Sequence, residues 1–289
     1  MSTEASLKKV KKLREITGVG FKDCKNAIDA CNGDIEKSID FLRKKGISKF
    51  TKKMQRVATD GLISISGDKS KMSIIEINCE TDFVAKNEEF KKFVEEISNI
   101  SLLNSGRMND ILNSQMKNKK NVQDNLISII AKIGEKITIR RSDFIDSKNS
   151  VNFSYAHMEV KKNLGKIGVL LSLETSMDKG KLSQFGKQLA MHIAASSPLS
   201  IDMDTLDHKI IEKEKEIITE ELKNSGKNDK IIDKIAAGKL NRFISENTLL
   251  NQEWIMDPKK KVKDIIKEIT TKEKIVVKKF VRFKVGEGI

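Results

Sequence analysis

Few residues of this 289-residue chain have the type and spacing that chemistry requires. The candidates are three cysteines and three histidines: Cys24, Cys31, Cys79, His157, His192 and His208. A metal site needs such ligands in closely spaced pairs, and covalent catalysis needs a nucleophile beside a general base. Neither pattern is found, so we expect reduced thiols, no metal site and no catalytic centre. His192 falls on an apolar helical face and is interpreted as a packed or solvent-facing imidazole.

Glycine-rich segments are the second place to look for chemistry, because backbone N–H groups in such loops can cradle phosphate. The chain has three of them, Gly18–Gly20, Gly165–Gly168 and Gly286–Gly288. Each lacks the strand-to-helix context of a phosphate loop, and the GxxxxGKS/T, HExxH and GxSxG motifs do not occur. We therefore expect no cofactor and a protein that is not an enzyme.

Strong positive charge leaves the class of partner open. The chain has 55 Lys and Arg against 41 Asp and Glu, a formal charge of +14, which suits nucleic acid, an acidic protein or simply a basic surface. Trp254 and Tyr155 are the sole members of their types, so stacking on bases is poorly supported and no direct nucleic-acid contact is expected. The first residues lack the apolar stretch of a signal peptide, and no apolar run of about 18 residues occurs. The sequence therefore predicts a cytoplasmic protein without a membrane span.

Helical periodicity dominates residues 1–57. Apolar residues recur at intervals of three and four until Gly18, again until Asn32-Gly33, and a third time from the N-cap candidate Asp34 to Gly46. This pattern predicts a small three-helix bundle over residues 6–46. So small a bundle is marginal unless it docks on something, and the 15 Lys and Arg against 7 Asp and Glu of residues 1–57 favour an acidic partner surface.

A period of two replaces the helical period in residues 58–145. Residues 61–66 and 72–79 are typical of a β-hairpin around Gly67-Asp68, and a helix with Asn87 as its N-cap follows. Residues 104–121 are polar and loop-like, residues 122–132 are helical, and residues 135–144 form a strand. The unit is therefore hairpin, helix, helix and strand.

The same order recurs in residues 146–289. Strands are expected at 151–157, 166–174 and 275–285, and helices at 182–196 and 262–269. Between Leu206 and Asn247, two amphipathic helices separated by residues 224–228 interrupt the repeat as an antiparallel, coiled-coil hairpin. The fold class is therefore α+β: a three-helix bundle, then a duplicated α+β core of residues 58–145 and 146–289, with a helical hairpin inserted at about 206–247.

Several segments together resemble the elongation factor Ts family. They are Leu13–Ala27, Asn32–Asp34, Val57–Gly61, Glu76–Ala85, Ala131–Glu135, Gly168–Leu170, Ala190–Ala195 and Phe283–Gly288. The resemblance covers nearly the whole chain. It implies a ubiquitin-associated-like N-terminal bundle, a two-part core with a helical hairpin, and acceleration of GDP release from elongation factor Tu.

The resemblance also implies which residues meet the GTPase. In the family, the Asp and Phe of a Thr-Asp-Phe-Val element enter between two helices of the GTPase domain and disturb its Mg²⁺ site and phosphate loop. The matching loop here is Thr81, Asp82, Phe83 and Val84. Supporting contacts match Lys25, Lys53, Ile133, Gly134, His157, Ile255 and Met256. Spacing alone would make Asp82 a turn residue, Phe83 a core aromatic, and the others solvated lysines, a helix-ending glycine and ordinary packing.

Another class of function stays open on the residues alone. The charge and the helical hairpin also suit a basic coiled-coil RNA-binding or scaffold protein, and the hairpin is compatible with dimerisation. The chain departs from the family pattern at Phe21-Lys22, where two Met are common, and at Met158, where Gly is common. GDP release from the GTPase, measured with and without the chain, separates the two classes.

Overall fold

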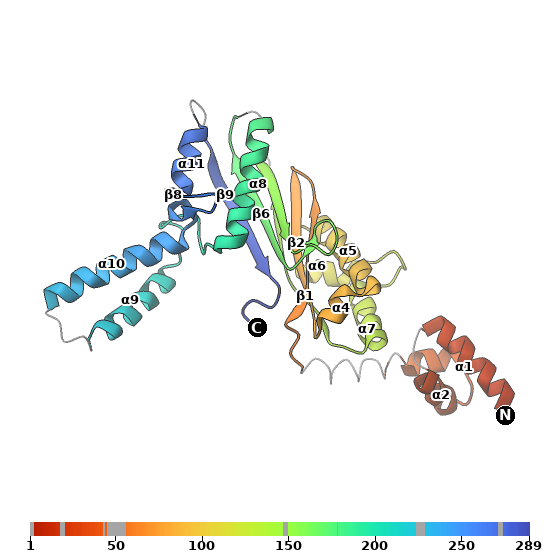
Figure 1. Ribbon diagram of the computed structural model, residues 1–289. Helices are drawn as coiled ribbons and strands as arrows, with labels where there is room; N and C mark the ends of the chain where they lie inside the picture. Colours follow the sequence, from red (N-terminus) through yellow and green to blue (C-terminus); the bar gives the residue numbers. More distant parts are fainter. Residues whose placement is uncertain are drawn as a thin grey trace.

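The computed structural model describes residues 3–17, 21–42, 44, 56–146, 150–177, 179–223, 229–270 and 274–289. Its first elements are helices α1 (Thr3–Thr17) and α2 (Phe21–Ala30), and residues 35–42 are also helical. Their common core consists of Val10, Leu13, Cys24, Ala27, Ile28 and Leu42. The three predicted helical segments are found, with α1 beginning at Thr3 rather than near residue 6. In Figure 1 these helices lie apart from the sheets.

A four-stranded antiparallel sheet organises the first half of the core. β1 (Asp60–Gly67) and β2 (Lys71–Cys79) form the predicted hairpin, and β3 (Ile137–Asp146) pairs with β2. The strand order is β3-β2-β1-β5. The last strand, β5 (Leu164–Gly165), comes from the second half of the chain and pairs with β1 at Ile63 and Ser64. Backbone hydrogen bonds thus join the two halves.

Helices that follow β2 gather on one side of this sheet (Figure 1). They are α4 (Asp82–Lys86), α5 (Glu88–Leu103), α6 (Met108–Asn113) and α7 (Val122–Ile133). Phe90, Val94 and Ile97 lie on one face of α5 and are fully buried with Leu62 and Ile77 of the sheet. The predicted helices beginning after Asn87 and at Val122 are therefore confirmed.

Two expectations for this half are wrong. Thr81–Val84 is not a loop, because Asp82–Lys86 form the short helix α4 with Val84 and Ala85 buried in the core. Residues 104–121 are not all loop, because α6 places Ile111 in the same core. A helical segment with so few buried apolar side chains is too short to show a periodic pattern in the sequence.

A three-stranded antiparallel sheet, of order β4-β6-β9, organises the second half. Its strands are β4 (Val151–His157), β6 (Ile167–Glu174) and β9 (Val276–Lys284), with helices α8 (Lys179–Ser196) and α11 (Val262–Ile269). The second strand of the hairpin is central in each half, and both central strands have a register shift against the last strand. The turn of 3-10 helix η1 (Leu249–Asn251) and the short strands β7 (Glu253–Trp254) and β8 (Asp257–Lys261) were not predicted.

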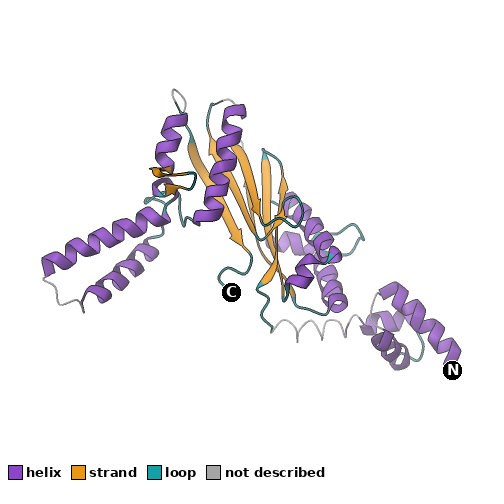
Figure 2. Cartoon of the chain, in the orientation of Figure 1, coloured by secondary structure: helices purple, strands orange, loops and turns teal. Residues whose placement is uncertain are grey.

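The inserted hairpin consists of α9 (His208–Lys223) and α10 (Asp229–Asn247). Ile211 near the start of α9 shares a small core with Ile244 near the end of α10, so the helices run antiparallel as predicted. Lys239 and Glu221 form an ion pair of 2.7 Å between them. Figure 2 shows the pair of helices projecting away from the sheets.

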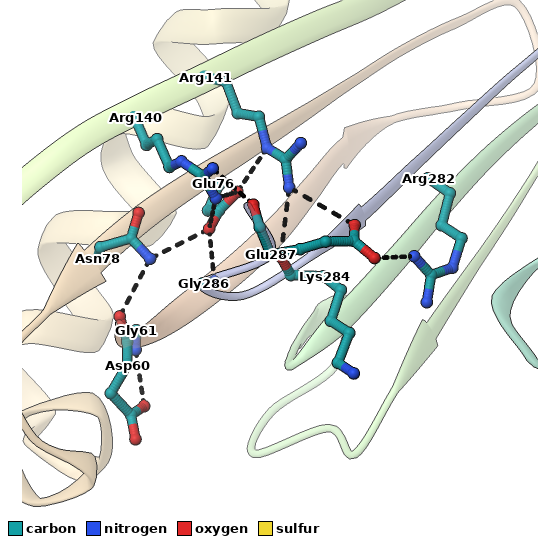
Figure 3. Close-up of polar contacts among 10 residues, drawn as sticks. All are labelled: Asp60, Gly61, Glu76, Asn78, Arg140, Arg141, Arg282, Lys284, Gly286 and Glu287. Atoms are coloured by element: carbon teal, nitrogen blue, oxygen red, sulfur yellow. Dashed lines mark hydrogen bonds and ion pairs between the residues drawn. The ribbon is translucent and has the colours of Figure 1, made fainter. Parts of the chain in front are cut away.

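A buried carboxylate joins the first sheet to the C-terminal turn (Figure 3). Glu76 of β2 has an exposed fraction of 0%. Its four hydrogen-bond donors are Arg140 Nη1 at 3.0 Å, Arg141 Nε at 2.5 Å, Asn78 Nδ2 at 3.0 Å and Gly286 N at 2.9 Å. Arg140 and Arg141 also donate to the carbonyl oxygens of Glu287 and Lys284. Gly286 has a φ of +74°, and a Cβ there would lie 2.3 Å from the Thr59 carbonyl oxygen, so only glycine fits this turn.

The charge state of Glu76 is set by these contacts. Burial by itself would raise the pKa of this carboxyl, but the hydrogen bonds from Gly286, Asn78, Arg141 and Arg140 outweigh it and hold the pKa below its ordinary value of 4.5. Because the pKa is lower in the folded state than in the unfolded state, Glu76 contributes its full stability above pH 4.5. That contribution is lost as the pH falls through the folded pKa.

We expect Glu76→Gln to lower the free energy of unfolding by about 3 kcal/mol, because it leaves two arginines without their buried counter-charge. Glu174→Gln, which removes an ion pair with Lys278 between half-exposed side chains, is the matched control and should cost less than about 1 kcal/mol. Urea denaturation measures both. Below pH 4.5 the parent should lose stability more steeply than Glu76→Gln, and parallel pH profiles would contradict the assignment.

Candidate partner-binding site

Helix α4 presents Phe83 to solvent. β2 ends at Cys79, and two residues lead directly from it into the helix. Val84 and Ala85 are buried, whereas the Phe83 side chain is 80% exposed. Phe83 is therefore not the core aromatic that its spacing suggests. An aromatic ring held outward on an anchored element is typical of a contact residue in a binding surface.

The neighbouring carboxylate is ionised and paired. Lys86 Nζ lies 2.7 Å from Asp82 Oδ2, one turn along the helix. The hydrogen bond from Lys86 lowers the pKa of Asp82, and the charge of Lys166 adds to this effect. The same contact raises the pKa of Lys86. Both side chains are largely exposed, so the pair is weak and can open when another partner approaches Asp82.

Asn87 ends α4 and begins α5. Its backbone N–H donates to the Val84 carbonyl oxygen at 3.0 Å, which closes the last turn of α4. Its side-chain Oδ1 accepts from the backbone N–H groups of Glu89 at 2.9 Å and Phe90 at 3.2 Å. One residue therefore fixes the angle between the short helix and the long, buried one.

The tertiary structure brings the end of α7, which carries Ile133 and Gly134, to the start of α4 through Glu135. Gly134 ends α7 in the left-handed conformation, with φ of +92°, and donates its N–H to Ile130. Ile133 packs against the first core. The carboxylate of the next residue, Glu135, then accepts from Thr81 N at 3.1 Å and Thr81 Oγ1 at 2.8 Å. Two segments predicted separately thus belong to one surface.

His157 lies at the same end of the sheets as α4. It is the exposed last residue of β4, and its Nδ1 is 3.0 Å from the Tyr155 hydroxyl. Lys166 N donates to the His157 carbonyl oxygen at 2.9 Å, and Lys166 Nζ pairs with Asp60. Asp60 in turn stands opposite Cys79, where β2 leads into α4. Lys166 therefore connects His157 with the start of the α4 region.

Ile255 and Met256 form a second, separate surface on the turn between β7 and β8. Their side chains are 39% and 41% exposed. His192 supports this turn from the protein interior: its ring stacks on that of Trp254, with 5.2 Å between the ring centroids. His192 Nδ1 also lies 3.4 Å from the Ile255 N–H, which donates to it. Of the two expected states of His192, packed or solvent-facing, the structure has the packed one, and this imidazole supports the turn that carries Ile255 and Met256.

The tautomer of His192 follows from Gln252. The Gln252 amide nitrogen donates to the carbonyl oxygens of Ser196 at 3.1 Å and Glu246 at 2.8 Å, so its Oε1 faces His192 Nε2 at 3.0 Å. Nε2 therefore carries the proton and Nδ1 is the acceptor, which is a neutral imidazole. Burial lowers the pKa of His192, and the hydrogen bond to Gln252 opposes this only in part.

The remaining predicted residues are placed differently. Lys25 is exposed on α2, whereas Lys53 lies outside the described residues. Val84 is 7% exposed, so it anchors α4 instead of facing a partner. Sequence reasoning gave no role to Glu135 or Lys86, although both fall at the edges of family segments. Glu135 reaches a residue 54 positions away, and no local pattern reveals such a contact.

The described residues contain no group of three or more His, Cys, Asp and Glu suited to a metal ion. All three cysteines are described, and they form no disulfide. Burial, with the nearby charge of Asp60, raises the pKa of Cys79 to about 12, so this thiol is unreactive. In the part of the chain that the structure covers, no helix has the length and apolar character needed to cross a membrane.

Comparison with known proteins gives a consistent result. The family model described as Elongation factor TS matches residues 80–287. The chain is 41% identical over 283 residues to the elongation factor Ts of Rickettsia felis, covering 97% of this chain and 91% of the relative. It is 42% identical to the elongation factor Ts of Rickettsia prowazekii and 38% identical to that of Maricaulis maris, with the same shares covered.

The neutral state of His192 predicts a pH dependence. Since its pKa is lower in the folded than in the unfolded state, its contribution to stability is complete above pH 6.5 and is lost as the pH falls toward the folded pKa. Urea denaturation at pH 7.5 and at about pH 5.5 should therefore show a loss of stability that is smaller in His192→Gln. The exposed His208, changed to Gln, is the control and should keep the parent's pH dependence. Identical pH dependence in His192→Gln and the parent would contradict the assignment of a neutral His192.

Proposed function

The chain belongs to the elongation factor Ts family, the nucleotide exchange factors of elongation factor Tu, and from this premise we propose that α4 is the element that promotes GDP release. As a member of this family the chain has no catalytic chemistry of its own. We also propose that it works in the cytoplasm, with elongation factor Tu as its partner and without direct contact to nucleic acid.

The exposure of Phe83 carries this proposal. Val84 and Ala85 fix the inner face of α4 in the core, while the Phe83 ring stands 80% exposed on the outer face. Because the backbone of α4 is already fixed, little backbone conformational entropy is lost when the ring is buried, so more of that burial appears as affinity. We infer that it enters between two helices of the GTPase domain and stabilises the arrangement that holds nucleotide weakly.

Asp82 adds charge to this insertion. Its carboxylate is one residue from Phe83 and is paired with Lys86 at 2.7 Å. A carboxylate brought near Mg²⁺ and phosphate competes for the metal or repels the phosphate oxygens. Because the surface pair with Lys86 is weak, Asp82 can exchange it for groups of the partner.

Exchange then follows from thermodynamic coupling. If binding of the chain weakens nucleotide affinity tenfold, a coupling free energy of about 1.4 kcal/mol, nucleotide binding weakens the affinity for the chain equally. The chain therefore opens the nucleotide site and leaves when fresh nucleotide binds. This cycle needs no bond to be made or broken by the chain.

The other residues that match the family's contact positions form three groups of supporting contacts. Ile133, Gly134 and His157 share the end of the sheets that carries α4, so we assign them to the same face of the partner. Ile255 and Met256 would meet a second part of the partner from the β7–β8 turn. The basic N-terminal module, with Lys25 on α2 and Lys53 after it, is the docking element for an acidic surface.

The hairpin α9–α10 has a separate proposed role in dimerisation. Ile217 on α9 and Ile231 on α10 are 50% and 51% exposed, although both are large apolar residues. The pair of helices projects from the sheets, so its outer surface is accessible to a second copy (Figure 2). Apolar residues left on the outside of a two-helix hairpin are typical of helices that pack against further helices.

We expect Phe83→Ala to slow the release of fluorescent GDP from elongation factor Tu by about 30-fold, the effect of removing an interface hot spot. Asp82→Asn should slow release less, and the double variant most. Leu103→Ala, which truncates another side chain exposed to 83% in the same half, is the control and should exchange like the parent.

Each variant should keep the parent's melting temperature, because these side chains are exposed. A Phe83→Ala variant as active as the parent would sink the assignment of α4. If the parent itself left GDP release unchanged and instead bound RNA in a salt-sensitive way, the alternative class would be favoured.

Dimerisation predicts a concentration-dependent sedimentation coefficient. The parent should sediment as a dimer at high protein concentration, and Ile217→Glu with Ile231→Glu should sediment as a monomer, because each dimer would bury unpaired carboxylates. Leu7→Glu, an exposed apolar position on α1, is the control and should leave the dimer intact. A parent that is monomeric throughout would refute this role of the hairpin.

A further inference from the structure

We propose that Glu135 is a positioning residue that holds α4, and with it Phe83 and Asp82, in the orientation used for exchange. The effect of Glu135 on GDP release rests on the proposed function of α4, but its effect on the structure of α4 can be tested alone. Glu135 belongs to the turn between α7 and β3, whereas α4 follows β2, so a contact between them couples two separate segments.

The contact is a reciprocal set of hydrogen bonds, here called the 81–135 clasp, formed by Glu80, Thr81, Glu135 and Lys136. The Glu135 carboxylate accepts from Thr81 N at 3.1 Å and from Thr81 Oγ1 at 2.8 Å. In the opposite direction, Glu80 Oε1 accepts from Lys136 N at 2.5 Å. Hydrogen bonds that involve an ionised carboxylate are stronger than those between neutral groups. The clasp therefore fixes both segments more firmly than a surface ion pair does.

The clasp continues the pairing of β2 with β3 beyond the last backbone pair. That ladder ends with Cys79 opposite Ile137. Past this pair the side chains of Glu80 and Glu135 bond the backbone N–H groups of the opposite segment. The start of α4 is thus fixed relative to the sheet by side chains at the point where strand hydrogen bonds end.

Arg56 reinforces the outer side of the clasp. Arg56 Nη1 reaches Glu80 Oε2 at 3.2 Å, and Lys136 Nζ donates to the Arg56 carbonyl oxygen at 2.7 Å. The segment that enters β1 is therefore bound to the same two residues that face each other across the clasp. Three separate parts of the chain converge at the start of α4.

Helix α4 needs such a support because it cannot form alone. It has five residues, far fewer than an isolated helix requires. Thr81 occupies its N-cap position but makes no side-chain cap; its hydroxyl donates to Glu135. Rotation about the Thr81 backbone would swing Phe83 away from its present direction, and Glu135 prevents it by holding both Thr81 donors.

Amide hydrogen exchange tests the structural part directly. In Glu135→Ala, the backbone amides of Ala85 and Lys86 should exchange about tenfold faster than in the parent, as expected for loss of a hydrogen bond to a charged group. Amides of β2 and β3 should keep their protection. Glu135→Gln, which retains one acceptor oxygen, should give an intermediate result. The control is Glu96→Ala, which removes a carboxylate bonded to the Lys117 N–H at 2.6 Å without touching α4.

GDP release from elongation factor Tu tests the consequence. When the chain is present at saturating concentration, GDP release from elongation factor Tu should be about tenfold slower with Glu135→Ala than with the parent. The chain concentration that gives half of the maximal rate should change little. In a background that carries both Phe83→Ala and Asp82→Asn the same substitution should have no further effect, because Glu135 acts through the orientation of these two side chains. A direct contact between Glu135 and the partner would instead add its own effect in that background.

The outcomes separate this inference from the proposed function. Unchanged exchange of the α4 amides in Glu135→Ala overturns the clasp as a positioning device. Faster amide exchange with parental GDP release, in an assay where Phe83→Ala is slow, overturns its role in function. If Phe83→Ala itself behaves like the parent, the proposed function fails, whereas the amide exchange still decides whether Glu135 holds α4.

Discussion

Glu76 is the point on which the two halves of the core depend. Its carboxylate is fully buried in the middle of β2 and binds two arginines of β3 and the backbone of the C-terminal turn at Gly286. A buried charge is tolerated only when every lone pair has a donor, so the strands and the turn must all be in place at once. The second half is therefore bound to the first through a contact that is lost if any one of its parts moves.

The same two strands lead to the candidate site. β2 carries Glu76 and ends two residues before α4, and β3 carries Arg140 and Arg141 and begins two residues after Glu135. Hydrogen bonds between β2 and β3 run without a gap from the buried carboxylate to the last pair, apart from one register shift. The fixed interior thus extends to the base of α4, and the backbone that carries the exposed Phe83 is held in place.

An exchange factor of this design needs no enclosed pocket of its own. In the function proposed above, it acts through an exposed ring, a carboxylate and further contacts at a fixed distance from them. The α4 surface rests on the first core, and the Ile255–Met256 turn rests on His192 and Trp254 in the second. The junction at Glu76 and the strand β5, which crosses from the second half into the first sheet, hold these two surfaces at a set angle.

The sequence by itself determined most of the element types, the order of the two halves and, through the family segments, the family; it also made Asp82 and Phe83 the proposed contact residues. These features are carried by local periods of two and 3.6 residues and by contiguous motifs, which a sequence displays directly. Only the tertiary structure decided that a helix begins at Asp82, that Val84 anchors this helix in the core, and that Phe83 faces outward. It alone joined Thr81 to Glu135 and Ile255 to His192, because those contacts join residues 54 and 63 positions apart. Their geometry arises from how the sheets and helices pack, and no local pattern of residue types encodes it.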